Sequence, residues 1–481
     1  MKPRLKFNGA TGLRVKASSY DAATQGRRAS GWVAPSSGPN SSLTGNLSTL
    51  RNRSRAGYRN NPLISMGTNR GVSNEIGTGV VPRFLSTDKA FTEAMSSLFD
   101  RWAMECDPEL NLDYYGLGTQ MCRARRVGGE CFVRLRRRRT SSGLSIPIQI
   151  QVLESEFVPE TLYETRPNGN RVKAGIEYNR LGQRVAYWMY PEHPNERDSH
   201  AYYGRLLRIP VQDVIHHFQP TRPGQSRGEP DTVQALLKAH TFDTYDDAEL
   251  LRKQTKAPYT GSLTRDSWTE DDYNYDPLSG QELPKGTDVP ELNVQAGSIL
   301  TLLPGEKIDL FQGDDTGQGY ADFMKEQKLL IAAGIGIPFE LMTGDWSNIN
   351  DRLYRAMINE YRREVEALQD QITIHQCNRK IVDWSIHSAV LNGLVPAVNY
   401  HADKSVYHKV EHRPQGWKHI HPLQDIQAAV KAIDNDLKSR DRVIAENGGW
   451  DAEEVDRQNV EAEKRIKTLR EKAELTPKAE N

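Results

Sequence analysis

Two helical patterns that flank an acidic, proline-rich segment constrain the fold of this chain most strongly. Residues 231–257 repeat apolar side chains at spacings of three and four and stop at Pro258, because proline cannot continue a helix. Residues 318–336 show the same spacing. The segment between them, 258–316, is interrupted by prolines and glycines. If the two helices run antiparallel, this segment is held at the far end of a two-helix stalk.

We expect the apolar face of each helix to be its packed face. In the first helix this face comprises Val233, Leu236, Leu237, His240, Tyr245, Ala248 and Leu251. In the second it comprises Phe323, Gln327, Leu330 and Ile331, with Lys325, Glu326 and Lys328 on the other side. The segment between the helices is expected to hold short strands at 259–263, 298–302 and 307–311.

A break and a polar loop follow the second helix. Gly334–Pro338 ends the helix, because glycine frees the backbone and proline forbids continuation. The polar loop covers 343–351, and a longer helical pattern continues from 352 towards 393, with a break expected near residue 375. Two helices joined by such a loop form an element that can project into a space.

Charge is balanced overall but separated along the chain. Lys and Arg number 63, as do Asp and Glu. Residues 1–85 hold thirteen basic and two acidic residues, whereas residues 265–315 hold twelve acidic and three basic residues. Blocks of this size indicate interaction surfaces rather than ordinary solvation.

A β-rich part is predicted over residues 130–220, where apolar and polar residues alternate. A hairpin is expected from 131–136 and 146–153, with Arg136–Arg139 at its tip. Further strands are expected at 171–178, 184–190 and 205–218. The four consecutive arginines could grip phosphate, but a solvated loop or a contact between subunits fits them equally well.

The N-terminal region is predicted to be a flexible arm followed by helices. Residues 1–40 are rich in Gly, Ser, Pro and Arg and lack helical periodicity. Residues 41–61 are expected to form a helix with a basic face, which is either a surface for nucleic acid or an acidic partner, or simply solvated. The arginines of this face are Arg51, Arg53, Arg55 and Arg59. Further helices are expected at 63–76, 87–105, 113–126, 423–434, 440–446 and 452–470.

Catalytic signatures are scarce in the sequence. It contains no Gly-Lys-Ser or Gly-Lys-Thr and no Cys-x-x-Cys, whereas Gly224-Gln-Ser-Arg-Gly228 matches Gly-x-Ser-x-Gly by residue letters alone. His408-Lys-Val-Glu411-His412 matches a zinc-peptidase signature, but Val406, His408 and Val410 alternate as in a strand, which holds the histidines too far apart to share one ion. The acidic residues of 265–315 lack an organising histidine. We therefore predict no catalytic residues, no metal site, no cofactor and no enzymatic activity.

Membrane and secretion signals are also missing from the sequence. No apolar run approaches the roughly 18 residues of a membrane helix, so we expect no membrane partner. Met1–Phe7 lacks the apolar core of a signal peptide. The cysteines show no close pairing, which suits a reducing cytoplasm. They are Cys106, Cys122, Cys131 and Cys377.

A series of different short motifs follows a characteristic order along nearly the whole chain. The most informative is Gly336-Ile-Pro-Phe-Glu-Leu-Met-Thr-Gly-Asp345, followed by Ser347, Asn350 and an Arg-rich helix. The others are Tyr20–Ala23, Gly31-Trp32, Gly38–Asn40, Arg59–Pro62, Gly77–Gly79, Gly128–Arg134, Gln151–Glu154, Ala174–Glu177, Arg184–Trp188, Arg222–Gln225, Arg227-Gly228 and His421-Pro422. In this order they resemble the lambda-like family of tailed-phage portal proteins. One departure is Asp351-Arg-Leu353, where the family usually has Tyr-Ser-Ser.

The resemblance implies an α+β portal-type fold that assembles as a ring, expected to be a dodecamer. Its parts would be an N-terminal arm (1–40), a wing (41–230), a stem helix (231–257), a small α/β clip (258–316), a second stem helix (317–337), a tunnel loop (338–351), a long helix that returns to the wing (352–420), a helical crown (421–470) and a frayed tail (471–481).

The resemblance also implies which residues meet the partners. The tunnel-loop residues expected to face DNA are Thr343, Gly344, Asp345, Trp346, Ser347, Asn348, Ile349 and Asn350. Lys325 and Lys328 are candidates for the channel wall, although ion pairs with a neighbouring subunit fit them equally well. The clip residues expected to dock partners are Asp266, Glu270, Asp271, Asp272, Tyr273 and Tyr275.

The function implied is that of a virion component at one capsid vertex, assembled in the host cytoplasm. Such a protein nucleates head assembly, docks the terminase large subunit and passes double-stranded DNA during packaging and ejection. Its other partners would be the major capsid and scaffolding proteins and the head-completion or tail adaptor proteins. The alternatives are another ring-forming head–tail connector, or a nucleic-acid-binding protein on a helical scaffold.

Overall fold

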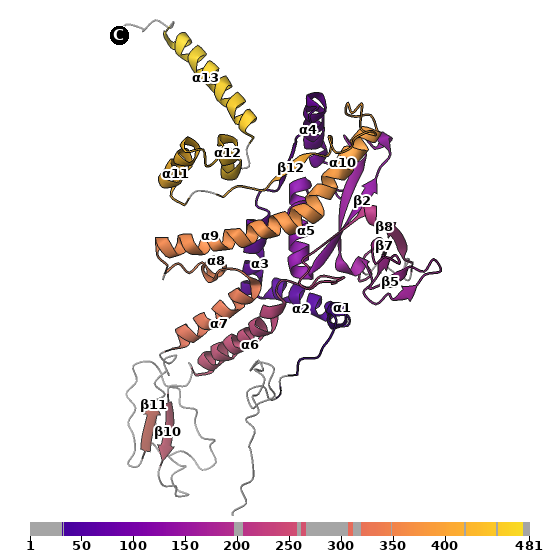
Figure 1. Ribbon diagram of the computed structural model, residues 1–481. Helices are drawn as coiled ribbons and strands as arrows, with labels where there is room; N and C mark the ends of the chain where they lie inside the picture. Colours follow the sequence, from indigo (N-terminus) through magenta and orange to yellow (C-terminus); the bar gives the residue numbers. More distant parts are fainter. Residues whose placement is uncertain are drawn as a thin grey trace, which may run out of the picture.

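The computed structural model combines helices and sheets in an extended arrangement (Figure 1). The residues that it describes are 31, 33–196, 205–256, 261–265, 306–310, 319–347, 349–417, 420–448 and 451–474. The α+β class expected from the sequence is confirmed.

Three helices open the described chain: α1 (Pro39–Leu43), α2 (Leu47–Asn60) and α3 (Pro62–Glu75). The single helix predicted over 41–61 is therefore divided, because Gly45 adopts a φ of 86° that no helix continues. Most of the predicted N-terminal arm, residues 1–30 and 32, lies outside the described residues.

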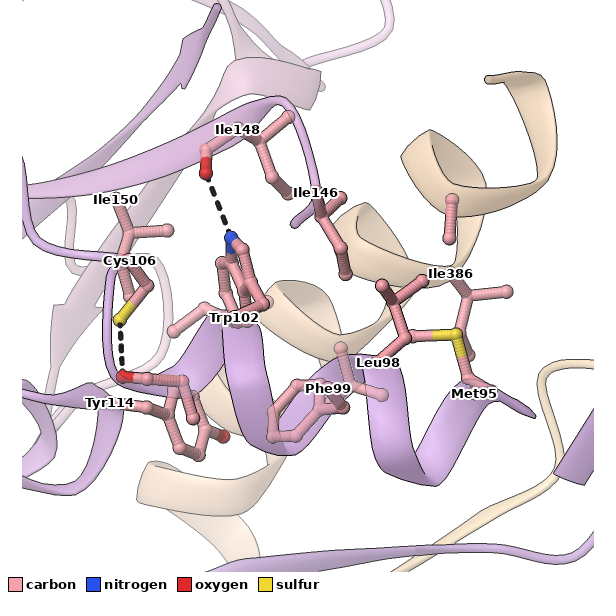
Figure 2. Close-up of a cluster of buried hydrophobic side chains, with 14 of the residues drawn as sticks. Met95, Leu98, Phe99, Trp102, Cys106, Tyr114, Ile146, Ile148, Ile150 and Ile386 are labelled. Atoms are coloured by element: carbon pink, nitrogen blue, oxygen red, sulfur yellow. Dashed lines mark hydrogen bonds between the residues drawn. The ribbon is translucent and has the colours of Figure 1, made fainter. Parts of the chain in front are cut away.

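A large core forms where α4 (Lys89–Ala103) and α5 (Tyr114–Gly128) pack on a three-stranded sheet. Carboxylates start both helices, since Asp88 accepts from the Phe91 N–H and Asp113 from the Gly116 N–H. Figure 2 shows Trp102 in this core, where its Nε1 donates to the Ile148 carbonyl at 2.8 Å.

The three-stranded sheet has the order β3-β2-β9. It comprises β2 (Glu130–Arg137), β3 (Ile148–Glu154) and β9 (Val214–Phe218). The predicted hairpin is confirmed, because β2 and β3 pair antiparallel with Val133 opposite Val152.

Two predicted strands are wrong in detail. Residues 171–178 form a hairpin rather than one strand, because Ala174 and Gly175 adopt positive φ and reverse the chain. Residues 205–218 divide at Pro210 between two sheets. The five-stranded sheet comprises β4 (Glu164–Thr165), β5 (Arg171–Lys173), β6 (Ile176–Tyr178), β7 (Arg184–Met189) and β8 (Leu207–Pro210).

One long helical rod crosses the molecule (Figure 1). It comprises α9 (Asp351–Leu368), a π-helical stretch (Gln369–Asn378) and α10 (Arg379–Leu391). The break expected near residue 375 is thus a change of winding. Side chains of the π-helical stretch are held by other elements: Thr373 donates to Glu75 and Gln376 donates to the Phe218 carbonyl.

The C-terminal helices follow a strand that pairs with the first of the described strands. β12 (Val410–Arg413) pairs antiparallel with β1 (Val81–Phe84). The helices are α11 (Pro422–Asp434), α12 (Arg440–Gly448) and α13 (Ala452–Glu474), which lie apart from the main body in Figure 1. None of the helices described is long and apolar enough to span a bilayer.

Candidate functional site

The two helices that flank the acidic segment pack side by side. α6 (Val233–Lys256) and α7 (Tyr320–Ile335) share one core. They run antiparallel, since Ala235 lies against Gly334 whereas Asp246 accepts a hydrogen bond from Tyr320. A Cβ at Gly334 would approach the Ala235 Cβ to 3.1 Å, so glycine allows the close contact.

A short antiparallel pair lies beyond the far end of these helices (Figure 1). It joins β10 (Gly261–Arg265) to β11 (Glu306–Leu310). The predicted strand at 298–302 lies outside the described residues. So do the expected docking residues Asp266, Glu270, Asp271, Asp272, Tyr273 and Tyr275.

The apolar faces predicted to be packed are largely exposed. On α6, Leu237 is 75% and Leu251 63% exposed, and on α7 Leu330 is 51% exposed. The faces that hold the two helices together instead use small or differently placed residues. These are Ala235, Ala239 and Phe242 on α6, and Met324, Ala332 and Ile335 on α7, together with Ile331, which is the residue of the predicted α7 face that is buried.

The break after α7 is built by glycine and proline as expected. Gly336 ends α7 with a φ of 77°, and Pro338 precedes a short helix, α8 (Phe339–Thr343). Gly344 then ends α8 with a φ of 73°. The predicted loop is therefore partly helical, and its irregular part begins at Gly344.

Asp345 organises the irregular part of the loop. Its Oδ1 accepts from the Ser347 hydroxyl at 2.6 Å and from the Ser347 N–H at 3.1 Å. These bonds, and the nearby charges of Lys325 and Lys328, lower the pKa of this exposed carboxyl. The structure thus brings both candidate lysines close to the loop. Lys325 also lies 5.7 Å from the centre of the Phe339 ring.

The rest of the loop leads into α9. The exposed Trp346 packs edge-on against Tyr354, with ring centres 5.5 Å apart. Asn350 starts α9, since its Oδ1 accepts from the Leu353 N–H at 2.9 Å. Ile349 is half-buried, and Asn348 lies outside the described residues.

The zinc-like motif does not gather its residues around one point. His408 lies in a turn before β12 rather than in a strand, so the alternation predicted from residue 406 is wrong there. Its Nδ1 hydrogen-bonds Asp383 at 2.6 Å, and its Nε2 hydrogen-bonds Tyr400. His412 lies in β12, where burial lowers its pKa to about 4.

One group among the described residues has metal-ligating side chains close together: Glu154, Glu156 and His193. Arg51 and Arg55 already form ion pairs with its two carboxylates. The arginines therefore balance the charge of these carboxylates, and the group is a contact between α2 and the β-rich part.

Most arginines of the two basic stretches have partners within the chain. On α2, Arg51 and Arg55 form the ion pairs just described, whereas Arg53 and Arg59 are exposed. Arg136 and Arg137 lie within β2 rather than at the hairpin tip, where they were expected, and Arg137 pairs with Asp213 at 2.6 Å. Arg136 and Arg138 donate to the glutamines Gln151 and Gln149.

Buried ion pairs were not foreseen from the sequence. Glu75 on α3 accepts from Arg125 and Arg126 on α5, each at 2.7 Å. Burial alone would raise the pKa of Glu75, but the two arginines and the Thr373 hydroxyl outweigh it and lower the pKa to about 2. Arg126 also pairs with Asp231, just before α6, and so connects α5 to the start of the α6–α7 pair.

A second buried ion pair joins two of the motifs that carry the resemblance. Glu130 pairs with Arg227 at 2.6 Å, accepts from the Gly228 N–H and hydrogen-bonds His216. Gly228 packs closely on Gly129, since a Cβ added to Gly228 would lie 2.1 Å from the Gly129 carbonyl oxygen. The motifs were the available signal, but about a hundred residues separate them, and spacing alone does not show that they meet.

Chains of two solved gene transfer agent structures align with this chain. One chain of the virion of a native gene transfer agent particle aligns over 84% of this chain and 93% of its own length, at 13% identity and a TM-score of 0.44. A chain of the neck of the native particle, computed with C12 symmetry, aligns over 73% and 94%, at 15% identity and a TM-score of 0.40.

Curated relatives carry the description of portal proteins. The probable portal protein of Halomonas phage phiHAP-1 is 25% identical over 321 residues, which is 66% of this chain and 60% of the relative. Portal protein B of Escherichia phage lambda is 22% identical over 311 residues, which is 60% of this chain and 57% of the relative. The chain thus matches less than two-thirds of the length of these relatives.

The family model described as phage portal protein, lambda family, matches residues 25–369. This range includes the α6–α7 pair, the loop after α8 and both buried ion-pair groups. Because the match covers well over half of the chain, the protein belongs to the lambda family of phage portal proteins.

Proposed function

We propose that this protein forms the ring-shaped channel at one vertex of a phage head, through which double-stranded DNA is packaged and later leaves. Family membership supports this proposal. The structural observation that carries it is the exposed apolar surface of α6 and α7.

This surface fits a neighbouring copy better than solvent. Leu237 and Leu251 on α6, and Phe323 and Leu330 on α7, leave large apolar areas uncovered. Full burial of such a side chain contributes about 1.5–3 kcal/mol. A contact between two different faces of identical copies forms a ring when the repeated rotation returns to the first copy. The α6–α7 pair would then be the stem of a ring, and β10–β11 would belong to its clip.

In such a ring the loop from Thr343 to Asn350 would face the axis. DNA must slide there, so the wall must not neutralise many phosphates, because each one neutralised strengthens binding. Asp345 beside Lys325 and Lys328 gives the wall both signs of charge. We therefore infer a surface that tolerates phosphates without holding them.

The partners proposed for the ring follow from its parts. The terminase large subunit and the head-completion or tail adaptors would dock at the acidic segment 265–315. Most of this segment lies outside the described residues. The major capsid and scaffolding proteins would meet the outer, β-rich part. The ring, expected to be a dodecamer, would reside in the virion after assembly in the host cytoplasm.

Charge reversal of the candidate lysines tests the channel role. We expect Lys325→Glu and Lys328→Glu to shorten the DNA that is packaged, because a loop already containing Asp345 would become strongly repulsive to phosphates. The measurement is the length of DNA in purified heads. Lys89→Glu, on the exposed start of α4, is the matched control. Packaged lengths equal to those of the control would reject the channel role.

A further inference from the structure

α11 presents an apolar stripe that the chain itself does not cover. Leu423, Ile426 and Val430 follow each other at spacings of three and four, so they share one face of the helix. They are exposed by 71%, 51% and 49%, and α11 buries none of its residues. A stripe of this kind on a short helix is typical of a helix that packs against another one.

α13 presents a second uncovered stripe. Val455, Ala462, Ile466 and Leu469 follow at spacings of seven, four and three, which is the a and d pattern of a coiled coil. Ile466 and Leu469 remain about half exposed. α13 extends away from the rest of the chain in Figure 1.

Charges beside the stripes complement each other. Asp434 ends α11 and Asp436 follows two residues later, whereas Arg465 and Arg470 flank Ile466 and Leu469 on α13. All four charged residues are exposed, and none of them forms an ion pair with another of the described residues.

Pairing of α13 with a second α13 is disfavoured by the same arginines. Equivalent helices of neighbouring copies in a ring run nearly parallel. In a parallel pair, the residue before an a position faces the residue after the next d position of the partner. Arg465 would therefore face Arg470 of the next α13, and like charges repel.

We propose that the α11 stripe of one copy packs against the α13 stripe of the next copy around the ring. This inference rests on the proposed ring. It adds a contact between two different faces, so each copy gives α11 to one neighbour and α13 to the other. The acidic end of α11 then lies beside Arg465 and Arg470.

Engineered disulfides between copies test this contact. Val430→Cys and Ile466→Cys are made in separate chains, coexpressed and oxidised; Leu469→Cys replaces Ile466→Cys in a parallel sample to allow for a shift of one turn. The four native cysteines are buried and free. Linked pairs are expected in the mixtures and not in either variant alone. The double variant in one chain is expected to give a ladder of linked copies up to the ring. Lys464→Cys, on the opposite face of α13, is the matched control and is expected not to link.

Particle size is measured in each sample, so that two failures are distinguishable. Rings without linked pairs in any mixture would overturn the α11–α13 contact and leave the proposed ring standing. Linkage in Ile466→Cys alone would overturn it in favour of paired α13 helices. Absence of rings in the unsubstituted protein would overturn the proposed function and this inference with it.

Discussion

At the scale of single residues, Glu75 is a buried charge that connects three separate elements. It lies on α3, binds Arg125 and Arg126 of α5, and accepts from Thr373 in the π-helical stretch. Arg126 extends the connection to Asp231 before α6. Because these charges are buried, each needs its partner, and the group fixes how the α6–α7 pair meets the body.

Removal of the Glu75 charge should therefore be costly. We expect Glu75→Gln to destabilise the protein by about 3–5 kcal/mol, because two buried guanidinium groups lose their counter-charge. Glu360→Gln, which breaks an exposed pair with Arg363, is the matched control and should cost under about 1 kcal/mol. Urea unfolding of both variants measures the difference. Equal losses would mean that the buried pair has no special role.

The same residue predicts how the difference depends on pH. Its pKa is lowered to about 2 from the usual 4.5, so its stabilisation is complete above pH 4.5 and declines as the pH falls towards 2. We expect the gap in melting temperature between the unsubstituted protein and Glu75→Gln to be constant from pH 7 to 5 and to narrow below pH 4.5. A gap that is unchanged at pH 3.5 would contradict the assignment.

These residues show where sequence reasoning ends at this scale. Gly129-Glu130 and Arg227-Gly228 were recognised as family motifs, and their order was sufficient to predict the family. Their contact across the fold was not predicted, because a motif has no information about its partner in space. Glu75 carried no signal at all, since a single acidic residue near a helix end is common.

At the scale of elements, helix ends were predicted more accurately than helix faces. Proline, glycine and capping side chains act locally, so α6 and α7 begin and end near their expected residues, and α9 begins near its expected start. The packed face predicted for α6 was wrong and that of α7 was right only at Ile331, because apolar spacing alone does not show which side of a helix its neighbour covers. The predictions of single strands at 171–178 and 205–218 were wrong for another local reason, because the turns within these segments were not recognised.

The close contact between α6 and α7 gives a prediction at this scale. We expect Gly334→Val to separate the helices, because its Cβ would meet both the side chain and the backbone of Ala235 at 3.1–3.2 Å. The melting temperature should fall, and the loop that follows α7 should shift. Ala333→Val adds a similar volume at an exposed position of the same helix and should change little. Equal melting temperatures for the two variants would show that the contact is not tight.

At the scale of the whole molecule, the uncovered surfaces have a consistent distribution. Apolar residues remain exposed on α6 and α7 on one side of the main body, and on α11 and α13 on the opposite side (Figure 1). The body between them is held by buried cores and buried ion pairs. Because the body has its own buried cores, the apolar surface that stays exposed on these outer helices is expected to be buried against copies of the same chain.

The state of the purified protein tests this conclusion most directly. Electron microscopy of single particles, combined with a mass measurement, reports both shape and copy number. We predict rings with a central hole, whose mass is a whole multiple, expected to be twelve, of the 54.4 kDa chain. Leu237→Glu with Leu330→Glu should disperse the rings without unfolding the chain, because both side chains are exposed in the single copy. Particles of a single chain, or compact aggregates without a hole, would contradict the account.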